Sequence, residues 1–330
     1  MTTHRERTLH AASEAARIFD RFAPQGRTSF DIVRAITILG FPIMFRPTKD
    51  LLGATVTVGE GARGILVTTK RGLAIQRFTL AHELGHLVLG HKLRFDLLTS
   101  DEVRWGPGEP GTQEERGADT FASELLAPRR LVSQVARRQK WHAANFRDPT
   151  IVYQLSLRLG LSFQATCWAL ARNRLLTEES ARRISNETEV NHIKLALASP
   201  YELPDSWADV WAVTEADVGL LLECGPNDAV VLSVKDHASA GYLWDVEESD
   251  GGFEVVFEKP DITESYGAEA SRVLLLRSKA AGNHRLVLRH KRPWSGELAA
   301  SVEFKVTNMG KEVDGLPRYV KRELLNPASA

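Results

Sequence analysis

Residues 76–86 read Gln-Arg-Phe-Thr-Leu-Ala-His-Glu-Leu-Gly-His, and this stretch decides how the first part of the chain folds. It contains no proline and one glycine, Gly85, and its apolar side chains recur at helical spacing, which predicts a helix over residues 76–89. His82 and His86 stand four positions apart, so they share one face of that helix and both imidazoles can reach a single ion. The sequence therefore predicts a metal site on this helix.

Glu83 lies between the two histidines but does not point in the direction in which they would bind an ion. In this position its carboxylate can take a proton from a water molecule on the metal. Zinc lowers the pKa of such a water toward ~7, and the carboxylate then completes its activation. We therefore expect Zn²⁺ as the cofactor and Glu83 as the general base of a hydrolytic reaction.

A catalytic zinc ion needs a third protein ligand and one open coordination position. Glu115 is the best candidate, because it lies at the start of the next predicted helix, residues 114–126, with Asp119 one turn later on the same face. We expect Glu115 to bind the metal and Asp119 to orient a ligating histidine. Glu114 would point about a quarter-turn away from Glu115, and Glu124 is expected to be solvated.

His91 is the nearest further histidine, but on a continued helix it would point to the side opposite His82. It would reach the metal only if the chain turned sharply at Gly90, so we expect a helix-end or surface residue. The donor that would stabilise an oxyanion is left open between three candidates chosen by residue type alone, which are His91, His142 and Tyr153.

Two sequence blocks carry a resemblance to a known family. Residues 76–86 are followed by Glu-Arg-Gly-Ala-Asp-Thr-Phe-Ala at 115–122 and by Leu-Leu-Ala-Pro at 125–128. In order and in separation, these blocks resemble the ImmA/IrrE family of zinc metallopeptidases over about residues 8–130. The resemblance implies a zincin-like domain whose relatives cleave helix-turn-helix repressors or antitoxins inside the cell.

The same resemblance implies roles for individual residues. It implies Glu83 as the general base and three metal ligands, His82, His86 and Glu115. Two positions depart from the usual family sequence. Gly117 stands where many members have glutamate, and Asp119 stands where asparagine is common. Neither departure removes an expected ligand.

The remaining elements of this domain are predicted from periodicity. Helices are expected over residues 8–24 and 31–39, and extended segments over 42–45, 54–58 and 64–69. A peptide substrate is expected to add along the strand at residues 65–69 through main-chain hydrogen bonds.

Residues 148–184 predict three short helices, with Arg-Leu-Gly-Leu-Ser at 158–162 forming a glycine-containing turn as in helix-turn-helix units. The segment also resembles the helical unit that follows the peptidase domain in IrrE-like proteins. The unit either docks DNA or a repressor through its second helix, near Arg158, Arg172 and Arg174, or it only braces the peptidase. We favour bracing, because the chain has no net basic charge and because three side chains are expected to be buried, Phe163, Cys167 and Trp168.

From about residue 209 to 308, short alternating segments separated by turns predict an immunoglobulin-like β-sandwich. His-Ala-Ser-Ala-Gly-Tyr-Leu-Trp at 237–244 and Arg-Pro-Trp at 292–294 resemble two loops of chagasin-like inhibitors of papain-type cysteine peptidases. The first loop lacks the usual asparagine, proline and threonines. The candidate partner-binding residues are Gly241, Tyr242, Trp244, Arg292, Pro293 and Trp294.

Two interpretations of these loops stay open. Trp244 and Trp294 are core residues of the sandwich in the first. In the second, the loops bind a peptide or protein partner, and so deliver substrate to the zinc site or cover it until a signal arrives.

The composition of the chain argues against several classes of protein. Lysine plus arginine and aspartate plus glutamate both number 42, so the formal net charge is zero, which argues against DNA binding. Cys167 and Cys224 lie far apart, so neither a thiolate zinc site nor a disulfide framework is expected. The N-terminus lacks the apolar stretch of a secretory signal, and no segment approaches the ~18 apolar residues that span a membrane. We expect a soluble cytoplasmic protein.

The expected fold class is multidomain α+β. The expected order is a zincin-like peptidase domain over 1–147, a helix-turn-helix-like unit over 148–190, a linker over 191–208, a chagasin-like β-sandwich over 209–308 and a tail over 309–330. These features favour an intracellular zinc endopeptidase that cleaves a regulatory protein, with the β domain binding substrate or a partner, or regulating activity. The alternative is a non-catalytic regulatory protein that binds a partner or DNA on a zincin-like scaffold, but the intact Glu83 argues against it.

Overall fold

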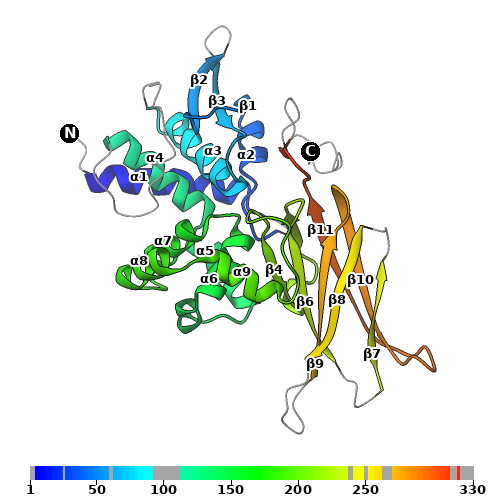
Figure 1. Cartoon of the computed structure of the whole chain (residues 1–330). Coiled ribbons are helices and arrows are strands. Elements are labelled where there is room, and N and C mark those ends of the chain that lie inside the picture. The colour runs from blue at the N-terminus through cyan, green and yellow to red at the C-terminus, as the bar shows by residue number, and fades with distance from the viewer. Residues whose placement is uncertain are drawn as a thin grey trace. The chain divides into compact units, whose positions relative to one another are not determined.

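The structure, a computed structural model, describes residues 4–24, 27–58, 62–91, 112–236, 241–248, 252–261, 270–312 and 318–319. The chain divides into two compact units, Met1–Thr188 and Glu189–Ala330. The first unit is mainly helical and the second is mainly built from strands, so the chain is α+β overall (Figure 1). Among the described residues, no helix combines the length and the apolar character needed to cross a membrane.

The first half of unit 1 is a small sheet with helices against it (Figure 1). Helix α3 packs against two of the strands and against α4, and α1 packs against α4. Ile65, Leu80, Leu84 and Phe121 are fully buried where these elements meet. The elements are α1 (His4–Arg21), α2 (Ile32–Ile38), β1 (Ile43–Arg46), β2 (Gly53–Val58), β3 (Ala62–Thr68), α3 (Leu73–Val88) and α4 (Gln113–Leu126).

The three strands lie in the order β1-β3-β2. Strand β3 is therefore central, with Ile65 paired to Ile43 of β1 in parallel and to Thr55 of β2 in antiparallel register. This arrangement corrects the expectation that substrate adds along residues 65–69, because both edges of that strand are already occupied. Among the described strands, β1 and β2 form the edges of this sheet.

Among the described residues, five further helices lie in unit 1. They are α5 (Arg129–Arg138), the 3₁₀ helix η1 (Ala143–Arg147), α6 (Pro149–Leu159), α7 (Phe163–Arg172) and α8 (Glu178–Glu187). Helix α5 was not predicted, because Pro128 was taken only as the end of α4, whereas it is the N-cap of α5. Proline is well tolerated at a helix start, where its missing N–H has no partner to lose.

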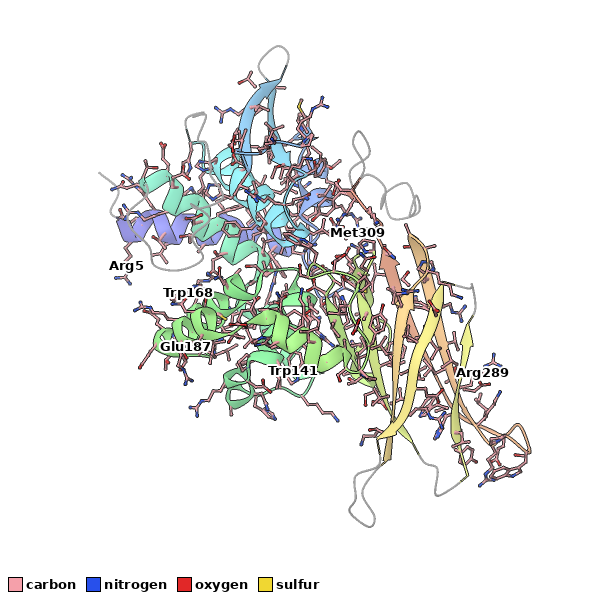
Figure 2. The ribbon with its side chains drawn as sticks, in the orientation of Figure 1. Arg5, Trp141, Trp168, Glu187, Arg289 and Met309 are labelled. Carbon is pink, nitrogen blue, oxygen red and sulfur yellow. The ribbon has the colours of Figure 1, made fainter. Side chains whose placement is uncertain are left out.

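The helical unit at 148–188 packs on the peptidase-like part instead of standing apart. Gly160, in the left-handed conformation (φ +66°), ends α6, and a Cβ atom there would lie 2.8 Å from Nε of Arg77 in α3. The Arg172 guanidinium of α7 donates to the carbonyl of Ser123 at 3.1 Å. Arg158 is fully buried, and its guanidinium lies 5.5 Å from the centroid of the Trp141 ring. Figure 2 labels Trp141 among the side chains of the helical unit.

Unit 2 contains two four-stranded sheets with the strand orders β5-β11-β10-β7 and β4-β6-β9-β8. Three consecutive residues are buried in each of two strands, residues 286–288 in β10 and 274–276 in β9, so both faces of these strands are covered there. The strands are β4 (Val210–Val213), β5 (Leu221–Cys224), β6 (Ala229–Asp236), β7 (Leu243–Glu248), β8 (Phe253–Asp261), β9 (Ala270–Ser278), β10 (Gly282–Lys291) and β11 (Leu298–Asn308).

The segment expected as a linker, 191–208, contains most of α9 (Val190–Ala198). Ala198 is fully buried in a cluster with Val210, Ala229 and Leu275, so this helix is part of unit 2. In the expected tail, Met309 and Tyr319 are also buried, while residues 313–317 and 320–330 lie outside the described residues.

Candidate metal centre

Two elements bring the candidate metal ligands together. His82 and His86 project from α3, and Glu115 lies in the first turn of α4, where the Thr112 side chain caps the helix by accepting from the Glu115 N–H. Nε2 of His82 lies 3.0 Å from Nε2 of His86 and 3.1 Å from Oε2 of Glu115. Nε2 of His86 lies 3.4 Å from Oε1 of Glu115. Three donor atoms from segments far apart in sequence thus converge on one point.

These separations fit a tetrahedral zinc site. Ligand atoms ~2.1 Å from a tetrahedral ion lie roughly 3.4 Å from one another, close to the 3.0–3.4 Å between the donors of His82, His86 and Glu115. The donor set of two imidazoles and one carboxylate also suits zinc. Three protein ligands would leave one position open on a four-coordinate ion, as hydrolytic sites require.

The second ring nitrogen of each histidine, Nδ1, also has a partner. Nδ1 of His82 lies 2.9 Å from Oδ1 of Asp119, and Nδ1 of His86 lies 3.0 Å from Nδ1 of His91. Such contacts fix the tautomer and the ring orientation, so that Nε2 of each histidine faces the point where the three donors meet. The structure thus places the Asp119 carboxylate against the ring of His82.

His91 was expected at the surface or at the helix end, pointing away from His82, and this expectation missed its contact with His86. Gly90 has φ +69°, and this left-handed turn brings His91 back toward His86. Gly117 makes the space, since a Cβ atom at 117 would lie 3.3 Å from Cε1 of His91. The sequence signal was Gly90, which permits the turn, together with Gly117 in place of a larger residue.

Glu83 is nearly buried and is held by a residue that the sequence analysis missed. The hydroxyl of Thr55 in β2 donates to Oε2 of Glu83 at 2.8 Å. Strand β2 can come this close because of Gly53, where a Cβ atom would lie 2.3 Å from the Thr79 side chain and 3.4 Å from Cγ of Glu83. The carboxylate of Glu83, the candidate general base, therefore lies between its own helix α3 and the edge strand β2.

The charges around the ligands favour a cation at their meeting point. Burial opposes a charge on His82, but hydrogen bonds to Asp119 and Glu115 outweigh it and raise the pKa of His82 to about 10. Burial acts against ionisation of Glu115 too, yet the two histidines hold the pKa of this carboxyl well below its usual range. Burial raises the pKa of Glu83, partly opposed by the histidines and Thr55. The cluster is therefore built to stabilise positive charge.

The other sequence candidates lie elsewhere or have other partners. Glu124, expected to be solvated, forms an ion pair with Arg172 at 3.0 Å. Tyr153 is buried in α6, and His142 is exposed at the start of η1. Of the three oxyanion candidates, His91 is the one that contacts a predicted ligand. Both cysteines are buried free thiols, in line with the expectation that they form no disulfide.

In unit 2 the candidate loop residues gather at one end of the β-sheets. Trp294 is 73% exposed, and a Cβ atom on Gly241 would lie 2.5 Å from its ring. The guanidinium of Arg292 lies 4.5 Å from the Tyr242 ring centroid, and both side chains bond the carboxylate of Glu297. Pro293 joins Arg292 to Trp294 in the same turn. Residues 237–240 of the first loop lie outside the described residues.

The two tryptophans therefore differ. Trp244 is 7% exposed, stacks on His290 with ring centroids 4.5 Å apart, and donates from Nε1 to the carbonyl of Lys235 at 2.6 Å. It is a core residue of the sheet. Trp294 is not, because most of its ring faces solvent.

Comparison with known protein families gives two matches. Residues 38–171 match the family described as IrrE N-terminal-like domain, a peptidase family, and residues 225–307 match the Chagasin family of peptidase inhibitors. The chain therefore carries a peptidase-like domain followed by a chagasin-like domain, as the two sequence resemblances predicted. No curated protein matches the chain.

Solved structures also match part of the chain. The cysteine protease inhibitor EhICP2 from Entamoeba histolytica matches at 20% identity and a TM-score of 0.29, over 31% of this chain and 96% of its own. Amebosin matches at 16% identity and 0.26, over 31% and 98%. PbICP-C, solved in complex with falcipain-2, matches at 13% identity and 0.21, over 31% and 92%.

Proposed function

We propose that this chain, an IrrE N-terminal-like domain followed by a chagasin-like domain, is a cytoplasmic zinc-dependent endopeptidase that cleaves a regulatory protein. The observation that carries the proposal is the convergence of His82, His86 and Glu115 within bonding distance of one ion, beside the buried carboxylate of Glu83. A bound zinc ion would supply Lewis-acid chemistry, polarising the scissile carbonyl and the attacking water.

The protein's own residues supply the remaining parts of the reaction. Glu83, oriented by Thr55, takes the proton from the attacking water and passes it to the leaving amine. Asp119 and His91 keep the two ligating imidazoles in fixed orientations. A merely structural metal site would need no buried carboxylate in the position of Glu83.

The edge strand β2 is the better candidate for binding a peptide. It lies on the side of β3 nearer Glu83, since its own Thr55 bonds that carboxylate. An extended substrate can add to such an edge through main-chain hydrogen bonds. The substrate would then run past the general base, which is the geometry that peptide hydrolysis needs.

The substrate class proposed is a helix-turn-helix repressor or an antitoxin, as the resemblance to ImmA/IrrE proteins implies. The contacts of Arg172 and Asn173 with α4 support a bracing role for the helical unit and speak against DNA docking through α7. The alternative function is a non-catalytic regulatory protein on the same scaffold, for which Glu83 would be dispensable.

Cleavage assays on purified repressors and antitoxins encoded near the gene test the proposal. Zinc-loaded full-length wild type should cut one of them at a defined bond. Glu83→Gln should retain zinc and cut on the order of 10²–10⁴-fold more slowly, because general-base catalysis contributes this much. Glu179→Gln, an exposed site on α8, is the matched control and should behave as wild type. Equal cleavage by wild type and Glu83→Gln would rule out Glu83 as the base.

The second function that we propose is the binding of a papain-type peptidase by unit 2. The exposed ring of Trp294, seated on Gly241 beside the Tyr242–Arg292 pair, favours it, because a rigid exposed aromatic is a frequent anchor of protein interfaces. Inhibition of a papain-type peptidase by the full chain should weaken at least tenfold in Trp294→Ala. Trp207→Ala, at a ring that is 82% exposed elsewhere in unit 2, is the control. Equal inhibition by all three proteins would contradict this role.

A further inference from the structure

The two units carry opposite net charges, although the whole chain is neutral. Residues 1–188 contain 27 lysines and arginines against 19 acidic residues, whereas residues 189–330 contain 15 against 23. Unit 1 therefore has a formal net charge of +8 and unit 2 one of −8. The balance that argued against nucleic-acid binding holds for the chain as a whole, but unit 1 taken by itself is strongly basic.

The basic residues of unit 1 are concentrated in and just after α5. The segment 129–147 contains five arginines and one lysine, and it contains no aspartate or glutamate. Four of these arginines lie in α5 and all four are exposed, namely Arg129, Arg130, Arg137 and Arg138. One face of this helix therefore presents a row of positive charge without an acidic side chain of its own.

The apolar side of α5 is buried, so the helix is not of the kind that inserts into a membrane surface. Leu131, Val132 and Val135 pack into the core of unit 1. A helix that binds a membrane in its plane needs its apolar face for the lipids. No large apolar side chain of residues 129–147, all of which the structure describes, is exposed. The exposed arginines are thus left for a polyanion in solution.

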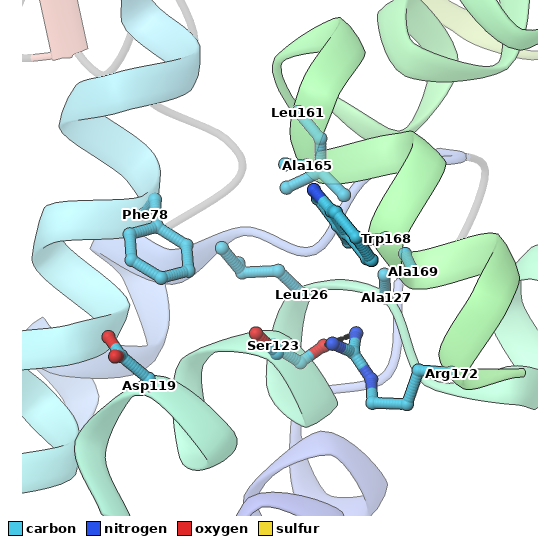
Figure 3. A pocket seen from close by; sticks show the side chains of 10 residues that line it. All are labelled: Phe78, Asp119, Ser123, Leu126, Ala127, Leu161, Ala165, Trp168, Ala169 and Arg172. Atoms are coloured by element: carbon cyan, nitrogen blue, oxygen red, sulfur yellow. Dashed lines mark hydrogen bonds between the residues drawn. The ribbon is translucent and has the colours of Figure 1, made fainter. Parts of the chain in front are cut away.

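The arginine of α7 is engaged within unit 1, unlike most of those on α5. The guanidinium of Arg172 donates to the carbonyl of Ser123 at 3.1 Å, as Figure 3 shows, and it pairs with Glu124 at 3.0 Å. On α5, Arg130 pairs with Asp20, but both side chains are more than half exposed. Exposed ion pairs contribute little, so a phosphate group can take the place of Asp20.

The stability of α5 does not explain all of its arginines. Positive charge is favourable near the C-terminus of a helix, which suits Arg137 and Arg138, but it is unfavourable in the first turn. In that turn Arg130 packs over the Phe19 ring, 4.1 Å from its centroid. Arg129 makes no ion pair or cation–π contact with any residue that the structure describes. An anionic partner from outside the chain would account for its charge.

The spacing of the two arginine pairs on α5 selects the kind of polyanion. The pair 129–130 and the pair 137–138 are eight residues apart, which at 1.5 Å per residue places them about 12 Å apart along the helix. The major groove of B-DNA is also about 12 Å wide, and phosphates border it on both sides. A helix that lies across this groove meets one row of phosphates with each pair. The guanidinium fork suits phosphate oxygens, which it can bind through two parallel hydrogen bonds.

We propose that the exposed face of α5, formed by Arg129, Arg130, Arg137 and Arg138, binds the phosphate backbone of duplex DNA across the major groove. Contacts to phosphates carry no sequence information, so the binding is independent of DNA sequence. It goes beyond the proposed peptidase activity and does not depend on it. It would bring unit 1 to the molecule on which a helix-turn-helix repressor, the proposed class of substrate, is itself bound.

Two matched pairs of arginine substitutions test this face. Arg137→Gln/Arg138→Gln removes two charges from α5, and Arg182→Gln/Arg183→Gln removes two adjacent exposed arginines from α8. A labelled DNA duplex of about 20 base pairs, or two helical turns, is titrated with each full-length protein at several salt concentrations. Fluorescence anisotropy gives the affinity and its salt dependence, and thermal unfolding shows that each variant is folded.

Wild type should bind the duplex with a dissociation constant on the order of 10⁻⁶–10⁻⁴ M, as is usual for binding without sequence specificity. The double variant on α5 should bind roughly tenfold or more weakly at low salt, and its slope of log K against log salt should be flatter by about 2. The double variant on α8 should match wild type. Arg129→Gln, at the other end of α5, should flatten the slope by about 1 and serves if the α5 double variant does not fold.

No binding by wild type at low salt, or equal losses in the α5 and α8 variants, would overturn the proposal. Poly-glutamate and phosphatidylglycerol vesicles, added as competitors, test two other anionic partners. Displacement of the duplex by either one at an equal concentration of charge would assign the face to an acidic protein or to a membrane surface instead of DNA. None of these measurements involves cleavage, so the proposed peptidase activity is tested separately.

Discussion

At the scale of single residues, the site consists of the candidate metal-binding side chains and of the residues that fix their orientation. His82 and His86 have the same side chain but different supports, a carboxylate from α4 and an imidazole after the α3 C-terminus. The carboxylate gives His82 a charged partner, and His91 gives His86 a neutral one. The position of His91 depends on two glycines, because Gly90 turns the chain and Gly117 leaves space for the His91 ring.

Removing His91 should weaken the metal site. In His91→Ala, Nδ1 of His86 loses its 3.0 Å partner and the ring loses its fixed orientation. Loss of such a supporting contact typically lowers metal affinity about 10–100-fold, which chelator competition measures. The d–d spectrum of the cobalt-substituted protein should change with it. His192→Ala, at an exposed histidine of α9, is the control. Unchanged affinity and spectrum in His91→Ala would show that His86 needs no support.

Asp228 should make the stability of unit 2 depend on pH. Burial, with the charge of Asp209 added, raises the pKa of Asp228 from 3.8 to about 6, although its oxygens accept from the Asp209 and Gly225 N–H groups and the Trp211 indole. The folded state holds the proton more tightly, so this contribution is complete below about pH 4 and is lost as pH rises through 6.

Relative to Asp228→Asn, wild type should therefore gain stability as pH falls from 8 to 4, by up to roughly 3 kcal/mol. Chemical denaturation of both proteins at several pH values measures this difference, and the variant serves as the reference for all other titrating groups. A difference that stays constant over this range would mean that Asp228 keeps an ordinary pKa in the fold.

At the scale of elements, the geometry of the metal site depends on how closely α3 approaches α4. Gly85 permits the approach, since a Cβ atom there would lie 3.1 Å from the Phe121 ring and 3.2 Å from Cα of Ala118. Glu115 lies one turn before Ala118 on α4, so the spacing of the helices sets the distance from the histidines to the third ligand.

Gly85→Ala should destabilise the protein, although alanine is the better helix former by about 1 kcal/mol. Overpacking at this contact is expected to cost about 1–3 kcal/mol and to weaken zinc binding by moving Glu115 away from His82 and His86. Thermal unfolding and chelator competition test both effects. Gly72→Ala, at the N-cap of the same helix with open space around it, should cost less than about 1 kcal/mol, because alanine is the poorer N-cap, and should leave zinc binding unchanged. Equal effects of the two substitutions would refute the close-packing explanation.

The elements also show how far sequence alone could lead. The spacing of His82, His86, Glu115 and Asp119 placed four side chains correctly on two helices, because α-helical periodicity converts sequence distance into a shared face. The order of strands in the sheet has no such local signal, so β3 was taken for an edge. Strands β4 and β5, four residues each, were too short to recognise individually.

The contacts missed by sequence reasoning were those between distant segments. Thr55 and Glu83 meet only after β2 folds onto α3, and nothing in the residues around either predicts the other. His91 was misplaced because a continued helix was assumed beyond Gly90. Trp244 and Trp294 belong to similar loop motifs, and only their exposed fractions, 7% and 73%, separate a core residue from a surface one.

At the scale of the whole molecule, the chain consists of two units whose cores are separate in sequence. The boundary falls between Thr188 and Glu189, so the helix-turn-helix-like unit belongs with the peptidase-like domain, and α9 belongs with the β-sheets. Every residue of the candidate metal centre lies in unit 1, and every candidate loop residue of the chagasin-like domain lies in unit 2.

Residues 1–188 should therefore fold and bind zinc when expressed without unit 2. Their thermal transition should coincide with one of the transitions of the full chain, and chelator competition should give a similar zinc affinity. A cut at residue 147, the sequence-predicted domain end, should instead give an unstable protein, because it removes the helices that pack on Arg77 and Ser123. A stable, zinc-binding 1–147 fragment would contradict this boundary.

The measurement that tests the central claim most directly is zinc stoichiometry by equilibrium dialysis of wild type, Glu115→Gln and Glu83→Gln. We predict one tightly bound zinc ion per chain in wild type and in Glu83→Gln, and a large loss of affinity in Glu115→Gln, because Glu115 is the proposed ligand and Glu83 is not. Wild type without zinc, or Glu115→Gln with undiminished zinc, would contradict the metal centre on which the account rests.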